Sequence, residues 1–217
     1  MTTLSKSKPA APLAGVTGAI LAGGDSRRFG RDKVTLELAG KPLALWVAEA
    51  LGPVVTETWL ITNRPLAHAA LGLPMATDLM PFQGPVGGLA TALFYARTPW
   101  VLLASADAPF LTAHLAFALA AAAGNLSRPA LVCRSERGLE PLPGLYAVRL
   151  LSRVQEFLKQ EKSFMALLER LRPEILGPEV WKTLDPEGAS FENLNHPEDL
   201  VRLAPRAVKR QKAGISG

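Results

Sequence analysis

Short apolar runs alternate along the chain with segments whose apolar residues recur at helical spacing. Apolar runs that end at glycine, proline or acidic residues are typical of buried strands. Their alternation with helices is the pattern of βαβ units, so it predicts an α/β domain with a mostly parallel central sheet flanked by helices. The predicted strands are residues 17–22, 58–62, 75–77, 100–104, 130–134 and 145–148, and the predicted helices are residues 42–51, 66–71, 89–96, 113–123, 150–158, 164–171 and 197–203.

Length and charge favour one domain between two basic ends. A chain of 217 residues with 48% hydrophobic content can bury one core. The formal net charge of +5 arises mainly from residues 1–15 and 204–217, which hold six basic residues and no acid. We therefore predict a folded domain over residues 16–203 between disordered tails at 1–15 and 204–217. Because the domain itself is nearly neutral, we expect no nucleic-acid groove.

Cysteine and histidine usage narrows the chemistry. Cys133 is the only cysteine, which excludes an intrachain disulfide and a cysteine-based zinc cluster and suits a reducing cytoplasm. It lies in an apolar run, so we expect a buried thiol that has no catalytic role. The three histidines, His68, His114 and His196, are too scattered to predict a metal site. No stretch approaches the roughly 20 apolar residues that a membrane-spanning helix needs, so we expect a cytoplasmic protein without a membrane partner.

The first predicted strand ends at Gly23-Gly24, at the sheet edge where open α/β folds bind ligands. Glycine lets backbone N–H groups approach an anion closely. The spacing matches neither a P-loop nor a dinucleotide fingerprint. A glycine pair after a strand is by itself more often a structural turn, but here positive charge follows it. The nearby cations are Arg27, Arg28, Arg31 and Lys33.

The whole segment from Leu21 to Lys33, LAGGDSRRFGRDK, resembles the signature of molybdenum cofactor guanylyltransferases, with Phe29 where methionine is more usual. There are two further departures. Ala108 stands where many members have threonine or methionine, and His196 stands where many have threonine. The resemblance spans nearly all of residues 17–203. It continues through Asn63-Arg64, Asp78 and residues 84–89, 107–110, 141–146 and 191–200.

This resemblance implies a single-domain Rossmann-like nucleotidyltransferase fold and a reaction between GTP and molybdopterin, either free or loaded with molybdenum. A terminal phosphate of molybdopterin attacks the α-phosphorus of GTP, and pyrophosphate leaves. The resemblance also implies that Asp107 contacts Mg²⁺. We expect a monomer that acts beside other proteins of molybdenum cofactor biosynthesis. The residues implied to bind GTP are Leu21, Ala22, Gly23, Lys33, Asn63, Asp78 and Asp107.

The implied roles suit the chemistry of these side chains. A carboxylate such as Asp107 can anchor Mg²⁺, which reduces repulsion between phosphates. Lys33 and Arg28 can neutralise the triphosphate and orient it, because transfer of this kind relies on positioning and electrostatics. Asp78 can accept hydrogen bonds from guanine. A purely structural explanation remains open for Asp78 as a loop cap and for Asn63 as part of a turn.

Three other functions compete with this one. A cytidylyltransferase acting on the same pterin typically has Leu-Ala-Ala-Gly where this chain has Gly23. A sugar-phosphate nucleotidyltransferase typically has a Pro-Leu-Thr run after its loop, which is missing here. A non-catalytic nucleotide-binding regulator would keep the loop but lose Asp107 or the surface for the second substrate. Because Asp107 and residues 141–146 and 191–200 are all present, the sequence favours the enzyme.

Overall fold

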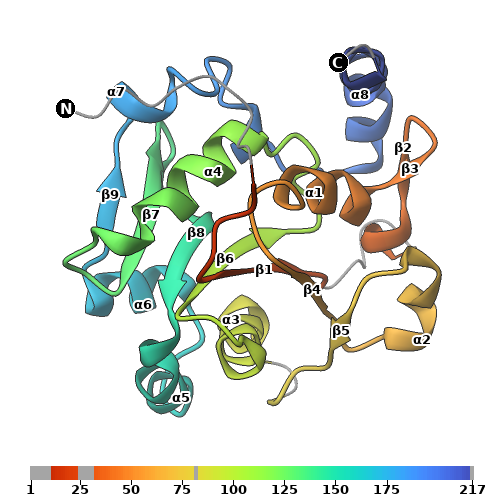
Figure 1. Cartoon of the computed structure of the whole chain (residues 1–217). Helices are drawn as coiled ribbons and strands as arrows, with labels where there is room; N and C mark the ends of the chain where they lie inside the picture. Colours follow the sequence, from red (N-terminus) through yellow and green to blue (C-terminus); the bar gives the residue numbers. More distant parts are fainter. Residues whose placement is uncertain (1–10, 24–31, 81–82, 216–217) are drawn as a thin grey trace.

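In the computed structural model, which describes residues 11–23, 32–80 and 83–215, a seven-stranded sheet runs between two layers of helices (Figure 1). The strand order is β5-β4-β1-β6-β8-β7-β9. All neighbours pair in parallel except where β8 lies antiparallel to β6 and β7. The predicted fold class is thereby confirmed. The strands are β1 (Val16–Leu21), β4 (Thr58–Ile61), β5 (Met75–Ala76), β6 (Trp100–Ser105), β7 (Ala130–Ser135), β8 (Gly138–Ala147) and β9 (Glu174–Leu176), with β2 (Glu37–Leu38) and β3 (Lys41–Pro42) forming a separate ribbon.

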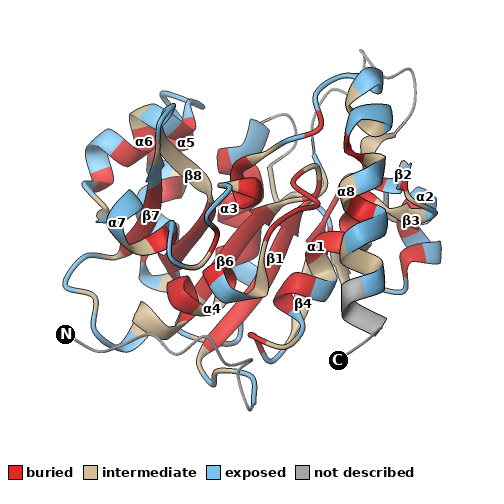
Figure 2. Cartoon of the chain, turned by 90° about the horizontal axis from the view of Figure 1, so that it is seen from above, coloured by how far each residue is buried: buried red, intermediate tan, exposed pale blue. Residues whose placement is uncertain are grey.

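Alternating side chains of the strands build a core on each face of the sheet. In β1, Val16 and Ile20 face the layer of α1 (Leu43–Leu51) and α4 (Ala113–Ala121), whereas Ala19 and Leu21 face the other layer. That second layer contains α3 (Gly84–Tyr95), α5 (Leu151–Leu158) and α6 (Phe164–Leu171). Figure 2 shows the sheet buried between these layers. The short helices are α2 (Pro65–His68) and α7 (Pro178–Trp181), and the 3-10 helices are η2 (Lys33–Thr35), η3 (Ala69–Leu71), η4 (Ala122–Gly124), η5 (Val148–Leu150) and η6 (Ala189–Phe191).

The parallel strands β5, β4, β1 and β6 end at a common level. Leu21, the last residue of β1, is in register with Ile61 of β4 and with Ser105 of β6, and Ile61 is in register with Ala76 of β5. Three backbone hydrogen bonds continue this alignment beyond the strands. They run from Ala22 N to Ile61 O, from Ala106 N to Leu21 O and from Thr62 N to Ala76 O, at 2.9, 3.0 and 2.9 Å.

Glycine brings α3 close to this edge. A Cβ atom added at Gly88 would lie 2.6 Å from Leu21 Cδ2, so only glycine lets the helix pack here without a shift of Leu21. The prediction that this helix begins at residue 89 was wrong by more than one turn, because α3 begins at Gly84, with Pro85 in its first turn. Proline is tolerated there since its missing N–H would have no partner within the helix.

The predicted C-terminal tail is corrected by the structure. A helix, α8 (Pro197–Ile215), continues through most of residues 204–217. Leu203 and Ala207 are buried in a cluster with Trp46 and Phe110, so the helix is held by tertiary packing. Helices of this length owe most of their stability to such packing, and a basic composition does not reveal it.

At the other end of the chain, residues 1–10 of the predicted tail lie outside the described residues, but residues 11–15 are in contact with the domain. The Leu13 N–H donates to Val54 O at 2.8 Å, and Leu13 forms an isolated parallel bridge with Val55. The sequence pattern also missed β2, β3, β9 and α7, and it predicted only the last part of β8. Pro141 and Pro143 interrupt the apolar pattern of β8, although the strand continues through them.

Arg210 fastens α8 to the domain, which predicts a measurable loss of stability when it is removed. Its guanidinium donates to the carbonyl oxygens of Pro109 and Leu111 at 2.8 and 2.7 Å, and burial lowers its pKa from the usual value. Because hydrogen bonds from a charged group contribute about 1.5–3 kcal/mol, Arg210→Ala is expected to lower the free energy of unfolding by that amount in urea titrations. The exposed Lys209→Ala is the control, and an equal loss in both variants would contradict the assignment.

Candidate functional site

The four aligned strand ends collect most of the residues singled out in the sequence. Ala22 and Gly23 follow β1, Asn63 lies two residues beyond β4, Asp78 two beyond β5 and Asp107 two beyond β6. In an open α/β sheet this carboxyl edge is where ligands bind. Parallel pairing therefore brings together side chains that are distant in sequence.

Lys33 and Asp107 form the polar centre of this edge. Lys33 Nζ lies 3.6 Å from Asp107 Oδ2, with the two side chains 20% and 24% exposed. Lys33 also donates to Leu194 O at 2.8 Å, while the Leu194 N–H donates to Asp107 O at 2.8 Å. Ser105 Oγ donates to Asp107 Oδ1 at 2.6 Å and orients the carboxylate. Both charged groups thus remain accessible to a ligand but are held in a defined arrangement.

Asn63 and Asp78 form a second pair on neighbouring strand ends. The Asn63 amide donates to Asp78 Oδ2 at 2.7 Å, and the Asp78 N–H donates to Asn63 Oδ1 at 3.2 Å. Thr91 of α3 approaches Asp78 Oδ1 at 3.5 Å and accepts from the Leu79 N–H at 3.1 Å. A carboxylate has about four lone-pair sites, so Asp78 keeps acceptor capacity beyond these contacts.

The segment 191–196 lies on the other side of Asp107. Leu194 is fully buried between the exposed residues Asn193 and Asn195. β8 begins near the same edge, because it runs antiparallel to β6 with Gly144 in register with Leu103. Arg137, next to the start of β8, donates to Phe191 O and joins the two segments. Polar loops therefore border Asp107 on the side away from Asn63.

One predicted catalytic residue, Arg28, lies outside the described residues, as do Gly24, Arg27 and Arg31. Their predicted phosphate contacts stay predictions.

Sequence reasoning missed a hydrogen-bonded group beside Lys33. Asp32 Oδ2 accepts from Arg64 Nη1 at 2.9 Å and from His68 Nε2 at 2.8 Å. His68 Nδ1 lies 2.8 Å from Thr62 Oγ1. His68 was set aside because no other histidine lies near it in sequence. The available signal was an aspartate directly before the predicted phosphate-binding lysine.

No cluster of three or more His, Cys, Asp or Glu side chains suited to a metal occurs within the described parts of the chain. Mg²⁺ in nucleotide sites is commonly bound by one or two carboxylates together with phosphate oxygens and water. Asp107 has the right donor chemistry, since its carboxylate offers oxygen ligands and its side chain is 24% exposed at the ligand-binding edge.

Comparison with known proteins decides the family. Residues 18–175 match the family model described as the MobA-like NTP transferase domain. A molybdenum cofactor guanylyltransferase of Cereibacter sphaeroides is 36% identical over 191 residues, which cover 85% of this chain and 93% of that protein. The chain belongs to the molybdenum cofactor guanylyltransferases. It is therefore a nucleotidyltransferase, as the resemblance of its glycine-rich segment implied.

One further curated relative and one solved structure extend the match. The molybdenum cofactor guanylyltransferase of Desulfosudis oleivorans is 30% identical over 198 residues, covering 89% of this chain and 96% of the relative. The crystal structure of molybdopterin-guanine dinucleotide biosynthesis protein A from Archaeoglobus fulgidus superposes with a TM-score of 0.78 at 27% identity, covering 89% and 99% of the two chains. The similarity thus extends over most of the chain.

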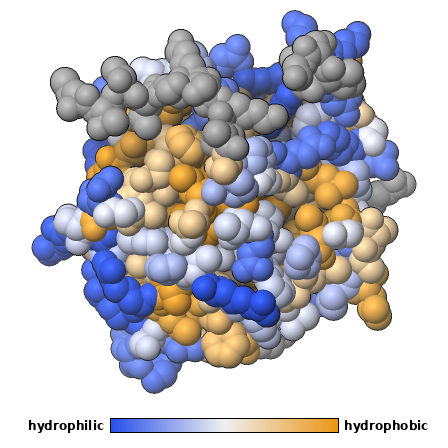
Figure 3. All heavy atoms as spheres, viewed as in Figure 1, coloured by the Kyte–Doolittle hydropathy of each residue, from blue (hydrophilic) through white to orange (hydrophobic). Residues whose placement is uncertain are grey.

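Within the described residues, no helix is both long enough and apolar enough to cross a bilayer. On the face shown in Figure 3, hydrophilic residues surround separate groups of hydrophobic ones.

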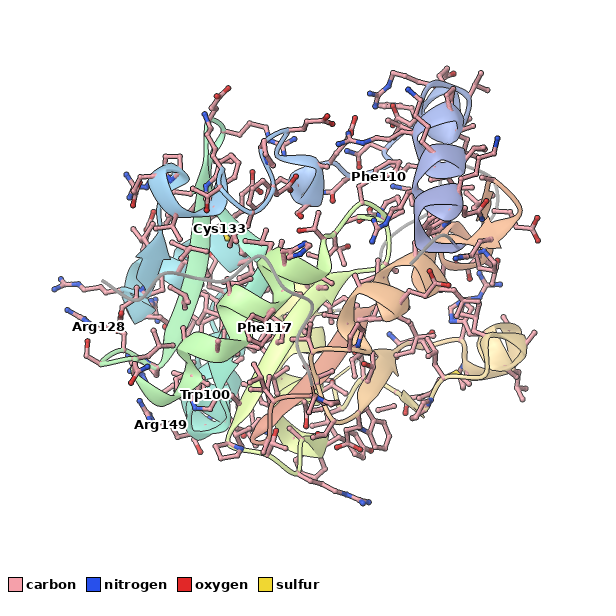
Figure 4. The ribbon with its side chains drawn as sticks, turned by 45° about the horizontal axis from the view of Figure 1, so that its top comes forward. Trp100, Phe110, Phe117, Arg128, Cys133 and Arg149 are labelled. Atoms are coloured by element: carbon pink, nitrogen blue, oxygen red, sulfur yellow. The ribbon has the colours of Figure 1, made fainter. Side chains whose placement is uncertain are left out.

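Cys133 takes no part in this guanylyltransferase site, which leads to a simple prediction. The thiol is fully buried in β7 (Figure 4), and burial raises its pKa to about 12. At pH 8 it is therefore protonated as well as shielded, and only the thiolate reacts quickly. We expect no reaction of the native protein with a disulfide reagent over minutes and one thiol per chain in guanidinium, measured by absorbance. Rapid labelling of the native protein would contradict this burial.

Proposed function

We propose that the protein transfers GMP from GTP to the terminal phosphate of molybdopterin. An oxygen of the acceptor phosphate forms a bond to the α-phosphorus of GTP, the bond from that phosphorus to the bridging oxygen breaks, and pyrophosphate leaves. The observation that carries the proposal is the 3.6 Å approach of Lys33 Nζ to Asp107 Oδ2 at the edge where four parallel strands end. A cation and a carboxylate side by side suit a triphosphate that arrives with a divalent metal.

Lys33 is proposed to bind the phosphates of GTP. Its ammonium is already held near Asp107 by the carbonyl of Leu194, so binding the triphosphate requires only a local exchange of partners. The backbone of Ala22 and Gly23 follows β1 directly and lies on the same edge, where it suits close approach of phosphate oxygens. Arg28 is proposed to add a second, forked cation.

Asp107 is proposed to hold Mg²⁺. The metal, when bound with the triphosphate, supplies neutralisation of phosphate charge. The Ser105 hydroxyl donates to one carboxylate oxygen of Asp107 and orients it, which leaves the other oxygen to bind the cation. The Lys33 ammonium now lies beside that second oxygen, so the carboxylate already attracts a cation.

Asp78 and Asn63 are proposed to select guanine. The Asn63 amide donates to the Asp78 carboxylate and accepts from the Asp78 backbone N–H, so the carboxylate keeps a fixed direction. Guanine offers two adjacent donors, N1–H and the exocyclic amine, and a rigid carboxylate accepts both. The acceptor pterin is proposed to lie on the opposite side of Asp107, against Asn193, Asn195 and the start of β8.

The finer expectations also remain proposals. The protein is proposed to act in the cytoplasm, a reducing compartment that suits the single free thiol of Cys133. It is also proposed to act as a monomer, which sedimentation would test. Transfer from CTP in place of GTP is the alternative, and the identity of the dinucleotide product separates the two.

Replacing the carboxylate of Asp107 is expected to abolish most turnover. Asp107→Asn keeps the size of the side chain and an acceptor for Ser105 but removes the negative charge that attracts Mg²⁺. We expect kcat to fall by about 100-fold or more, in line with the loss of one electrostatic contact to a transition state. Pyrophosphate release measured across a Mg²⁺ titration checks this. Glu169→Gln, at an exposed acid of α6, is the control, and wild-type kcat in Asp107→Asn would remove Asp107 from the mechanism.

The choice of nucleotide tests the function itself. The purified protein is incubated with Mg²⁺, molybdopterin and either GTP, CTP, ATP or UTP, and the dinucleotide product is identified by mass spectrometry. We expect product with GTP. A preference for CTP would reject the guanine assignment, and the absence of product with every nucleotide would contradict the proposed transfer to molybdopterin.

Asp78→Asn is expected to weaken this selectivity. An amide presents one donor toward the donors of guanine, so the KM for GTP should rise by about 10- to 100-fold while that for other nucleotides changes little. Steady-state kinetics with each nucleotide measure the effect, and thermal unfolding verifies the fold. An unchanged KM ratio would make Asp78 a structural cap.

A further inference from the structure

We propose that His68 is a positioning residue for Lys33, acting through Asp32. It lies at the end of α2 and joins the carboxyl end of β4 to the segment that carries Lys33. The proposal deepens the proposed function above and rests on it for the role of Lys33 toward phosphate, although the contacts of His68 with Asp32 and Thr62 stand by themselves.

His68 is 1% exposed, and both of its ring nitrogens have polar partners. Nε2 lies 2.8 Å from Asp32 Oδ2, and Nδ1 lies 2.8 Å from Thr62 Oγ1. A carboxylate offers only lone pairs, so Nε2 carries a proton and donates it. The Thr62 hydroxyl accepts the Arg64 N–H at 3.0 Å and can give its own proton to Nδ1. This buried imidazole therefore bridges a hydroxyl and a carboxylate in one orientation.

Asp32 connects His68 to the helical turn that begins with Lys33. Its second oxygen, Oδ1, accepts from the Val34 N–H at 3.1 Å and caps the 3-10 helix η2, of which Lys33 is the first residue. The Asp32 side chain is only 16% exposed, so its direction is set by His68, by Arg64 and by this cap. Lys33 follows directly in the chain and extends to Asp107 and Leu194.

His68 and Arg64 differ in what they contribute. The Arg64 side chain is 65% exposed and can leave Asp32 for solvent at little cost, whereas the buried ring of His68 has no such freedom. Thr62, the partner of Nδ1, directly precedes Asn63, the residue paired with Asp78. The Thr62–His68–Asp32 group therefore links the side of the site proposed for guanine to the side proposed for phosphate.

Two polar substitutions separate the two hydrogen bonds of His68. The amide nitrogen of His68→Gln can take the place of Nε2 and keep a donor for Asp32. The shorter His68→Asn matches Nδ1 and keeps only a partner for Thr62. His114→Asn, at an exposed histidine of α4, is the matched control. Thermal unfolding of each variant verifies that the domain is folded.

The first measurement needs no turnover. Under limiting amine-acylating reagent, the modification rate of Lys33, read by peptide mass spectrometry, should rise several-fold in His68→Asn because Lys33 leaves its held position more often. It should stay near the wild-type rate in His68→Gln and in His114→Asn. An unchanged rate in folded His68→Asn, or an equal rise in His68→Gln, would overturn the proposal. This result does not depend on whether the wild-type protein forms the guanine dinucleotide, so failure of the proposed function is seen separately.

The second measurement is a double-mutant cycle with Lys33→Ala. In the wild-type background His68→Asn should lower kcat by about 10- to 100-fold, the loss expected for a misplaced catalytic group, with the KM for molybdopterin unchanged. In the Lys33→Ala background the same substitution should have little further effect. An equal loss of kcat in both backgrounds would show that His68 acts independently of Lys33 and would reject its positioning role.

Discussion

Parallel pairing of β1 with β4 on one side and β6 on the other sets the level at which the candidate site is built. Leu21 is in register with Ile61 and Ser105, and the backbone hydrogen bonds of Ala22 and Ala106 carry the alignment past the ends of the strands. Because all three strands end together, the loops that follow leave the sheet side by side. A shift of one residue in either pairing would turn every side chain of a strand to the other face and would separate Asn63 and Asp107 from the glycine-rich segment.

The C-terminal part of the chain completes this edge from outside the sheet. The backbone of Leu194 is bonded on one side to Asp107 and on the other to Lys33, and its side chain is buried beneath α8 with Trp46 and Phe110. Arg210 then ties α8 to the loop after β6. Helix α8, which lies at the rim of the molecule in Figure 1, thus supports the loop that holds the two charged groups together.

Polar side chains at this edge are hydrogen-bonded to one another, which limits the free-energy cost of burying them and fixes their orientation. Asn63 and Asp78 exchange two hydrogen bonds, and His68 uses both ring nitrogens between Thr62 and Asp32. A buried polar side chain without partners would destabilise the domain, whereas a fully bonded one orients its neighbours. The arrangement therefore combines accessible charges at Lys33 and Asp107 with rigid support behind them, as expected for a site that works by positioning phosphates.

Local pattern was enough to predict the alternating strands and helices and hence the sheet, because apolar periodicity reflects burial of one face at a time. Asp107, Lys33, Asn63 and Asp78 were named because the resemblance to molybdenum cofactor guanylyltransferases implied them, and the structure places each after a strand or after the glycine-rich segment. Local pattern could not predict contacts between distant segments. Lys33 and Leu194, which are hydrogen-bonded, are 161 residues apart in sequence, and His68 and Asp32 are 36 residues apart. The same limit hid α8, whose residues 204–215 read as a basic tail. Ala204, Ala207 and the stem of Arg210 acquire partners only when Trp46 and Phe110 lie beneath them, and such packing depends on the folded chain rather than on neighbouring residues.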